Sequence, residues 1–365
     1  MLKSVPSGSR SLFTPVKIKD RVVKNRFMRS ATAVAMADPE GFVTEELCSF
    51  YREVAEGGVG LLITGAVSVH PRGKFFSRQL TAHTDAHIPG LERLAAAIHR
   101  HGDGVTVWPQ LHCGAAQHWE PAGGQKGHHL EISRLQEDDI RTIVSAFGDA
   151  ALRCQQAGFD GVQLHGAHRY LLSQFLSPAT NSRKDAWGGT PEKRMCIVLN
   201  IYEDIREKTG GNFPIGIKMN TADYLEGGNA VQDTARYAKR FAETGFDLIE
   251  MSGGMANLTE LRDELRKRAG QKEAYFRDAV PEFRRAAGST ALALCGGIRT
   301  PQVMQEILGE GVDFISLSRP LLAEPDLPNR IREGDYGGSR CASAASLCDY
   351  CREKVAKGFV KCIRR

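Results

Sequence analysis

The sequence has no apolar run of about 18 residues, the length that a membrane-spanning helix needs, although 42% of its 365 residues are hydrophobic. Residues 1–10, MLKSVPSGSR, contain no apolar stretch either, so we expect no secretory signal. The net charge of +5 is spread along the chain without a long basic block, which argues against nucleic-acid binding. These absences predict a cytoplasmic protein without a membrane or nucleic acid as its partner. They leave a homo-oligomer open.

The sequence also lacks a GxGxxG motif that follows a strand and opens a helix, so a Rossmann nicotinamide fold finds little support. Nine cysteines are present, and four of them crowd into residues 341–365. Without an export signal, we expect cysteines to be reduced thiols.

What the sequence does contain is a series of short apolar runs. They are apolar on both faces, as buried parallel strands are. There are eight of them: residues 26–31, 59–69, 104–111, 161–165, 215–220, 248–253, 291–297 and 314–319.

Amphipathic stretches typical of helices lie between most of these runs. One begins after Thr44 as its N-cap and stops at Gly57. Two others begin with Thr-Pro, at residues 190–191 and 300–301, the order expected for an N-cap and first helical residue. Eight strands alternating with helices predict an α/β fold of the (β/α)8 TIM-barrel type, with a doubly wound open sheet as the alternative.

We expect one barrel over residues 1–335 and a cysteine-containing C-terminal tail over residues 336–365, because no linker divides the chain earlier. Residues 112–136 and 254–275 are long for barrel loops. Both leave the C-terminal ends of predicted strands. We therefore expect them to cover the barrel mouth, unless they are plain surface decoration.

Glycines and an arginine follow the last two predicted strands, in CGGIRT (295–300) and SLSRP (316–320). Loops at these two places commonly hold a phosphate, and glycine lets backbone N–H groups approach an anion. Gly296, Gly297 and Arg319 are therefore candidate phosphate ligands. Tight-turn geometry is the alternative explanation of the two glycines.

Three further polar residues stand out. Lys218 lies in the apolar run IGIKMN, where its charge is costly unless it meets an internal ion pair or an anion in the barrel mouth. His165 and His168 follow another run, at the end of the strand where barrels bind ligands. Satisfied rim histidines and a metal site are the alternatives for this pair, although no third ligand is evident.

The chain resembles the old yellow enzyme family of FMN-dependent NADH:flavin oxidoreductases over roughly residues 11 to 335. LFTPVKIKDRVVKNRF is similar to the family's opening hairpin and first strand. The resemblance continues through EGGVGLLITG, GFDGVQLHGAHRYLLSQFLSPATNSRKDAWGGTPEKR, GGIRT and SRPLLAEPDLP. The barrel portion is also related to that of the 2,4-dienoyl-CoA reductase branch.

The resemblance implies an FMN across the top of the barrel. Lys218 stands where the family has Arg or Lys beside the flavin N1/O2 edge, and a cation there stabilises the reduced anion. The resemblance assigns His165 and His168 to gripping the ligand's oxygen and Tyr170 to donating a proton. The other implied FMN contacts are Ser30, Ala31, Thr32, Gly65, Gln110, Gly296, Gly297, Ser318 and Arg319.

Some positions depart from the family pattern. The spacing of Gln110 and His112 in PQLHCGAA leaves the register of this strand loose. Ser318 stands where family members often have glycine, a change that a backbone N–H contact survives. Either Thr32 or Ala33 occupies the position that often holds a redox-tuning Cys or Thr.

The tail LCDYCREKVAKGFVKC is similar to the [4Fe–4S] motif of the dienoyl-CoA reductase branch. It lacks a cysteine between Cys351 and Cys362, so we expect no metal there. Zinc or a cluster is the alternative, and its ligands would be Cys341, Cys348, Cys351 and Cys362.

The resemblance implies an enzyme that reduces activated alkenes, such as α,β-unsaturated carbonyls, with FMN and NADH or NADPH. One alternative is a flavin-dependent amine dehydrogenase or oxidative demethylase that passes electrons to a partner. Another is a non-catalytic flavin-binding barrel.

Overall fold

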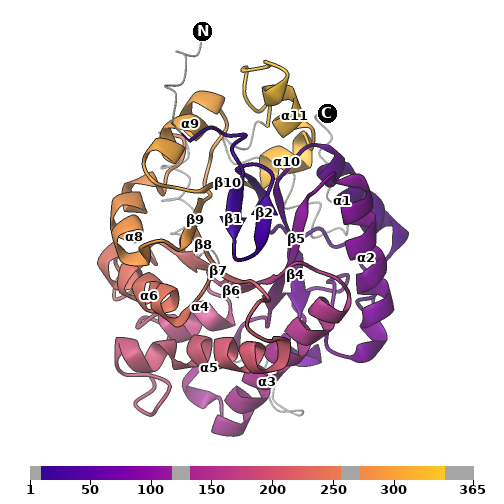
Figure 1. The fold of residues 1–365 in the computed structure, drawn as a ribbon. Helices are drawn as coiled ribbons and strands as arrows, with labels where there is room; N and C mark the ends of the chain where they lie inside the picture. Colours follow the sequence, from indigo (N-terminus) through magenta and orange to yellow (C-terminus); the bar gives the residue numbers. More distant parts are fainter. Residues whose placement is uncertain (1–9, 117–131, 256–271, 342–365) are drawn as a thin grey trace.

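The computed structural model describes residues 10–116, 132–255 and 272–341, and the structural statements below concern that part of the chain. Eight parallel strands close into a barrel in the order β10-β3-β4-β5-β6-β7-β8-β9, with helices around it (Figure 1). The open-sheet alternative is wrong, because β10 pairs with β3 and closes the ring. The strands are β3 (Phe27–Arg29), β4 (Leu61–Ser68), β5 (Thr106–His112), β6 (Val162–Gly166), β7 (Ile215–Asn220), β8 (Leu248–Ser252), β9 (Ala291–Leu294) and β10 (Phe314–Leu317).

Each strand lies at one of the eight predicted apolar runs, and nearly all strand residues are buried. The main outer helices are α1 (Glu45–Glu56), α2 (Ile88–His101), α3 (Glu137–Gln156), α5 (Pro191–Thr209), α6 (Val231–Thr244), α8 (Val280–Ala287) and α9 (Pro301–Gly309). Shorter ones are α4 (Leu171–Leu176), α10 (Arg319–Ala323) and α11 (Leu327–Arg332), with 3-10 turns η1 (Pro71–Gly73), η2 (Asp85–His87), η4 (Ile132–Arg134) and η5 (Arg277–Ala279).

All three predicted threonines are the N-cap residues of their helices, and two of them cap with their side chains. The Thr44 side chain accepts a hydrogen bond from the first turn of α1, and Thr190 does the same for α5. Thr300 precedes α9 without a side-chain cap bond. The carboxylate of Glu273 instead accepts from the backbone N–H groups of Arg299 and Thr300, at 2.9 and 3.0 Å. A side chain from a distant loop thus holds the two residues that lead into α9.

An antiparallel hairpin of β1 (Val16–Ile18) and β2 (Arg21–Val23) precedes the barrel. In Figure 1 it lies across the centre of the ring of strands. Ile18 and Val23 are buried in the same apolar cluster as Trp108, which lies on β5. The hairpin therefore plugs one mouth of the barrel, the end at which the strands begin.

Trp108 is fully buried, and glycines on the next two strands leave room for its indole. A Cβ atom at Gly161 would come within 2.7 Å of Trp108, and one at Gly216 within 3.0 Å. Because the large ring and the hairpin fill this end with apolar groups, the polar interior of the barrel lies toward the opposite mouth.

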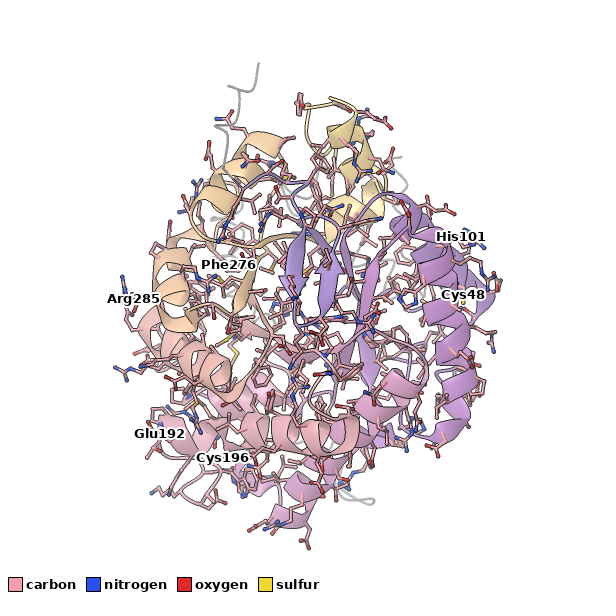
Figure 2. The ribbon with its side chains drawn as sticks, in the orientation of Figure 1. Cys48, His101, Glu192, Cys196, Phe276 and Arg285 are labelled. Carbon is pink, nitrogen blue, oxygen red and sulfur yellow. The ribbon has the colours of Figure 1, made fainter. Side chains whose placement is uncertain are left out.

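The six cysteines in the described ranges are free thiols. Figure 2 shows two of them, Cys48 on α1 and Cys196 on α5, on well-separated parts of the helical ring. Reduced thiols are thus what this part of the chain contains. No helix within the described ranges has the length and apolarity that crossing a membrane requires.

Candidate active site

Alternation along β5 builds the interior of the barrel in layers. Trp108, Gln110 and His112 are two residues apart, so they lie on the same face of the strand. Trp108 belongs to the apolar plug, and Gln110 lies one layer above it. The next layer carries His112, whose ring centroid is 5.4 Å from that of His165. The sequence of one strand thus leads from apolar plug to polar layer to histidine cluster.

The polar layer is centred on Glu250, a fully buried residue of β8. Its Oε1 accepts from the hydroxyl groups of Ser30 at 2.6 Å and Ser316 at 2.7 Å. Its Oε2 accepts from Gln163 Nε2 at 2.9 Å, and Gln163 in turn accepts from Gln110 at 2.7 Å. Residues from four other strands or strand ends therefore converge on one carboxylate, three directly and Gln110 through Gln163.

Lys218 is the cation of this layer. The register of β7 and β8 places it directly beside Glu250, and its Nζ lies 3.2 Å from Oε1. The same Nζ donates to Ser30 Oγ at 2.7 Å. Burial opposes the charge on Lys218, but Glu250 outweighs it and holds the pKa of Lys218 above its usual value. Burial likewise opposes charge on Glu250, yet Lys218 and the donors lower the pKa of that carboxyl. Both groups are therefore ionised, and the internal ion pair considered for Lys218 is present.

Above this layer lies a pocket of about 340 Å³. Lys218 lines it, so its charge faces both Glu250 and the pocket. The other lining residues come mainly from the ends of β3, β6, β8, β9 and β10: Ser30, Ala31, His168, Tyr170, Ser252, Gly253, Tyr275, Phe276, Cys295, Gly296, Gly297, Ile298, Ser316, Leu317, Ser318, Arg319 and Pro320.

One end of the pocket suits an anion. Gly296 and Gly297 have φ angles of 114° and 71°, a region that favours glycine, and a Cβ atom at Gly296 would lie 2.7 Å from Phe276. The Arg319 guanidinium lines the same end and has no hydrogen bond or ion pair with any described residue. Ser318 is held by a 2.7 Å hydrogen bond between its hydroxyl and that of Thr32.

At the other end His168 and Tyr170 line the pocket, and His165 packs beside them without lining the pocket itself. The ring centroid of His165 lies 5.3 Å from that of His168 and 4.7 Å from that of Tyr170. His112 lies 4.5 Å from Tyr170, and Phe75, which is partly exposed, lies 5.3 Å from it. The structure therefore brings all three predicted residues together and adds His112 and an aromatic wall.

The turn after β6 orients the side chains of His168 and Tyr170. His168 and Arg169 have φ angles of 63° and 64°, a left-handed region that costs energy for residues other than glycine. The backbone N–H of His168 donates to Asn220 Oδ1 at 3.2 Å, which holds the turn to the end of β7. Backbone strain that the surrounding structure maintains in this way is common at functional sites.

Both histidines are neutral near pH 7. Burial, followed by the nearby His168 and His112, holds the pKa of His165 well below its usual value. Burial and the Lys218 cation lower the pKa of His168 to about 3. The His168 Nε2 lies 2.7 Å from Ser252 Oγ, which leaves Nδ1 for a ligand. The His165 Nδ1 accepts from the N–H of Ala167 at 3.3 Å, so its proton is on Nε2.

The Tyr170 hydroxyl makes no hydrogen bond with any described residue, although the side chain lines the pocket. Burial raises the pKa of Tyr170 above its usual value. The phenol therefore keeps its proton through neutral pH. The end of the pocket with His165, His168 and Tyr170 offers N–H and O–H donors that the described protein does not use.

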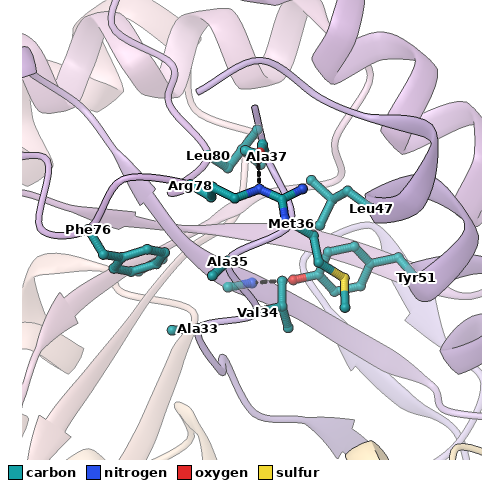
Figure 3. Close-up of a pocket in the computed structure, with 12 residues that line it drawn as sticks. Ala33, Val34, Ala35, Met36, Ala37, Leu47, Tyr51, Phe76, Arg78 and Leu80 are labelled. Atoms are coloured by element: carbon teal, nitrogen blue, oxygen red, sulfur yellow. Dashed lines mark hydrogen bonds between the residues drawn. The ribbon is translucent and has the colours of Figure 1, made fainter. Parts of the chain in front are cut away.

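Three predicted flavin contacts lie off the lining of this pocket. Gln110 turns its amide nitrogen to Gln163, and its oxygen has no partner among the described residues. Thr32 reaches the pocket through its bond to Ser318. Gly65 instead lines a void of about 10 Å³ with Ala33 and Tyr51, which has room for about one water molecule (Figure 3).

Position 65 leaves no room for a side chain. The Gly65 N–H donates to the Tyr51 hydroxyl at 2.5 Å, and a Cβ atom there would lie 2.7 Å from the carbonyl oxygen of Thr32. Gly65 thus lets β4 approach the loop after β3. Contact of Gly65 with the flavin remains a prediction.

Several pocket residues escaped the sequence analysis. Glu250 carries the same signal as Lys218, a charge inside an apolar run. Ser252 and Cys295 each lie at the end of a predicted strand, where ligand residues are expected. Tyr275 and Phe276 had no local signal, because they reach the pocket from the segment before α8.

Other predictions fall outside the described residues. The two long loops predicted to cover the mouth are mostly residues 117–131 and 256–271, which are not described. Of the four tail cysteines, only Cys341 is described, and it is a buried free thiol. The other three, Cys348, Cys351 and Cys362, lie beyond it, so the expectations for the tail and its boundary stay predictions.

The pocket fits FMN on three observations. Arg319 and the adjacent glycines offer an unpartnered cation and close backbone approach for a phosphate. Lys218 supplies a second cation farther along the pocket. The free donors of His165 and Tyr170 remain for a second molecule. The arrangement is that of a barrel enzyme with a long anionic cofactor and a small ligand beside it.

Comparison with known proteins agrees with this site. The family model of the NADH:flavin oxidoreductase / NADH oxidase family matches residues 11–337. The chain is 32% identical to an NADH oxidase of Thermoanaerobacter brockii, a match that covers 93% of this chain and 53% of that protein. It is also 32% identical to an NADPH dehydrogenase of Geobacillus sp. (strain WCH70), covering 87% of this chain and 92% of that one. A metal reductase of Desulforamulus reducens is 31% identical, covering 88% of this chain and 49% of that protein. The chain spans about half the length of the NADH oxidase and the metal reductase.

Solved structures share the fold. An old yellow enzyme homologue from Zymomonas mobilis superposes with a TM-score of 0.75 at 23% identity, covering 92% of this chain and 96% of that one. A 2-naphthoyl-CoA reductase complex gives a TM-score of 0.85 at 24% identity, covering 97% of this chain and 57% of that one.

Fold, pocket and matches define the class as flavin-dependent oxidoreductases that use FMN with NADH or NADPH. Within that class, the chain belongs to the NADH:flavin oxidoreductase / NADH oxidase family, the old yellow enzyme family. The predictions of the family and of its FMN cofactor are thereby confirmed.

Proposed function

We propose that this enzyme reduces electron-poor alkenes, such as α,β-unsaturated carbonyl compounds, with electrons from NADH or NADPH. The observation that carries the proposal is the cluster of His165, His168 and Tyr170 at one end of the pocket, with donors unused by the described residues. When bound, FMN supplies the hydride that adds to the β-carbon of the alkene.

The residues of the chain do the rest. Backbone N–H groups at Gly297 and Ser318, with the Arg319 guanidinium, would hold the phosphate of FMN. Lys218 would face the flavin ring. His165 Nε2–H and His168 Nδ1–H donate to the carbonyl oxygen of the substrate, which polarises the alkene and stabilises the enolate charge that develops there. His168 donates from Nδ1 in the tautomer in which its Nε2 accepts from the Ser252 hydroxyl.

Tyr170 then delivers a proton to the α-carbon. Its hydroxyl is protonated at neutral pH, and no described residue competes for that proton. A hydride at the β-carbon and a proton at the α-carbon together saturate the double bond, so atoms and charge balance over the reaction.

The test follows reduction and reoxidation of the flavin by its visible absorbance. Protein loaded with FMN should be bleached by NADH or NADPH without oxygen, and 2-cyclohexenone should restore the yellow absorbance. A titration with phenol should produce a long-wavelength charge-transfer band that is lost in His165→Ala. Reduction by NADPH with no reoxidation by any enone would overturn the proposal.

Oxidation of an amine is the second candidate, and two fold neighbours favour it. A histamine dehydrogenase from Rhizobium sp. 4-9 superposes with a TM-score of 0.79 at 25% identity, and a 6-hydroxypseudooxynicotine amine oxidase from Pseudomonas geniculata N1 with 0.80 at 24%. Anaerobic bleaching of the yellow protein by histamine or another amine, without NADPH, would support this candidate over alkene reduction.

A further inference from the structure

We propose that Glu250 sets the midpoint potential of the bound FMN, because its carboxylate neutralises the Lys218 cation. This inference rests on the proposed placement of the flavin ring beside Lys218. Glu250 does not line the pocket itself, so it acts through Lys218 and is a positioning residue.

The carboxylate is held ionised by its surroundings. It is fully buried, accepts from Ser30, Ser316 and Gln163, and lies 3.2 Å from Lys218 Nζ. Four donors on two oxygens saturate the group, so its charge is retained although no solvent reaches it. Replacing Glu250 with a neutral residue therefore removes this negative charge directly.

The remaining charges near Lys218 do not take over this role. Arg29 is a buried cation behind the pocket and opposes the Lys218 charge. Cys295 carries a thiol whose pKa is raised, first by burial, so it is neutral. His165 and His168 are neutral as well. Among the described residues that face Lys218, Glu250 is thus the group whose negative charge balances it.

This balance changes what Lys218 offers to the flavin. Two-electron reduction adds negative charge beside Lys218. An unpaired ammonium would attract that charge as a full cation, whereas a 3.2 Å ion pair attracts it mainly as a dipole, whose field decays faster. The ion pair therefore leaves the flavin with a lower potential than a lysine alone would. A lower potential makes the bound reduced flavin a stronger hydride donor and the oxidised flavin a weaker acceptor from NAD(P)H.

The experiment measures midpoint potentials of FMN-loaded proteins with a reference dye, at about pH 6 and about pH 8. Measurement at the two pH values shows whether Lys218 loses its proton in the variant, because its charge and its effect on the potential would then differ between them. Glu250→Gln should favour reduction by at least tenfold in the two-electron equilibrium constant, which corresponds to about 30 mV. Lys218→Met should shift the potential in the opposite direction. The double variant should match Lys218→Met, because a buried carboxyl without its cation takes up a proton.

A matched control is Asp247→Asn, which removes a carboxylate three residues before Glu250 in the chain. Asp247 is bound to Lys19 and Arg206 at the plugged end of the barrel, so its loss should leave the potential unchanged. The dissociation constant of the sulfite adduct gives a second readout, which should fall in Glu250→Gln along with the rise in potential. Should Glu250→Gln fail to fold, Glu250→Met replaces it, since its side chain has a similar length and no charge, although Ser30, Ser316 and Gln163 then lose their acceptor.

An unchanged or lower potential in Glu250→Gln, with the expected fall in Lys218→Met, would overturn the inference and leave the proposed function standing. A Lys218→Met variant with unaltered potential would instead show that the flavin ring is not beside Lys218. That outcome contradicts the proposed placement and with it the basis of this inference.

Discussion

The two mouths of the barrel treat polar groups in opposite ways. At the plugged mouth, Asp160, Asp247 and Asp313 each precede a strand and accept a hydrogen bond from a backbone N–H of the neighbouring strand. Each also meets cations, and Asp313 has three of them: Arg10, Arg26 and Arg284. The carboxylates at this mouth are therefore saturated from within the protein.

At the open mouth, three groups lack such partners. The Tyr170 hydroxyl, the Nε2 of His165 and the Arg319 guanidinium make no hydrogen bond with any described residue. Polar groups that the protein does not satisfy are available to a ligand, whereas satisfied groups stabilise the fold. We therefore assign fold stability to the plugged mouth and ligand binding to the open mouth, the general arrangement in this fold.

The largest effect should come from Tyr170→Phe at the open mouth. Hydride transfer from NAD(P)H to the flavin needs no proton from the protein, so flavin reduction should stay nearly intact. The alkene step needs a proton at the α-carbon, and losing general acid catalysis typically costs about 10²- to 10⁴-fold. Stopped-flow traces of the two half-reactions measure this separately.

Phe75 supplies the control for Tyr170. Phe75→Leu alters the ring that packs on Tyr170 at 5.3 Å and leaves the hydroxyl in place. It should change the KM of bulky enones more than the rate of the alkene step. If Tyr170→Phe slows both half-reactions equally, the tyrosine shapes the site and is not the proton donor.

The next largest effect is expected at the plugged mouth, in Asp313→Ala. The side chain of Arg26 is only 8% exposed, so it would lose its counter-ion inside the protein. Breaking a fully buried pair costs about 3–5 kcal/mol, and this partly exposed site should lose about 2 kcal/mol of unfolding free energy. Urea unfolding measures the loss, and FMN affinity should be unchanged. A fall in FMN affinity with no loss of stability would reverse the assignment of the two mouths.

This plugged mouth was also predictable from the sequence in a way that the sequence analysis missed. Gly-Phe-Asp or Gly-Val-Asp occurs before three strands, at residues 158–160, 245–247 and 311–313. In each, the glycine has a positive φ and the aspartate binds the preceding strand. This repeated motif alone identifies alternate strands of the barrel in the sequence.

The strands were predictable because burial on both faces leaves nothing but apolar runs in the sequence. Caps were predictable where the partner is three residues away, as at Thr44 and Thr190. The contact of Glu273 with the residues that lead into α9 was not predictable, because Glu273 reaches them from another loop. Patterns of neighbouring residues thus predicted the local structure. Contacts between distant loops could not be predicted from them.

The same limit applies to the site. Lys218 stood out as a charge in an apolar strand, but its partner follows from the register of two strands, which pairs it with Glu250. Ser30 approaches that pair from β3, 188 residues away in the chain. His165, His168 and Tyr170 lie in one short segment of the sequence, so the resemblance to the family identified all three at once.

A smaller effect should follow Arg319→Met, which removes the unpartnered cation of the open mouth. A hydrogen bond to a charged group contributes about 1.5–3 kcal/mol, and backbone donors remain, so FMN should bind about tenfold more weakly. Fluorescence quenching of added FMN measures the affinity. Arg285→Met is the control, because Arg285 lies at the outer edge of the helical ring and pairs with Glu282 (Figure 2). Equal weakening in both variants would show a general charge effect and no phosphate site at Arg319.

The smallest effect should be a pH dependence carried by His168. Burial and Lys218 lower its pKa to about 3 in the folded protein, against about 6.5 when unfolded. The folded state therefore keeps His168 neutral, and stability is present above about pH 6.5 and lost as the pH falls toward 3. Replacing it with asparagine removes this loss and suits the left-handed backbone at this position. The stability difference between the wild type and His168→Asn should shift by about 0.7 kcal/mol against the wild type from about pH 7 to about pH 6. Urea unfolding of the FMN-free proteins at both pH values measures it. A difference that stays constant would mean that His168 is as easily protonated in the folded protein as in water, and that the open mouth does not hold it as a neutral donor.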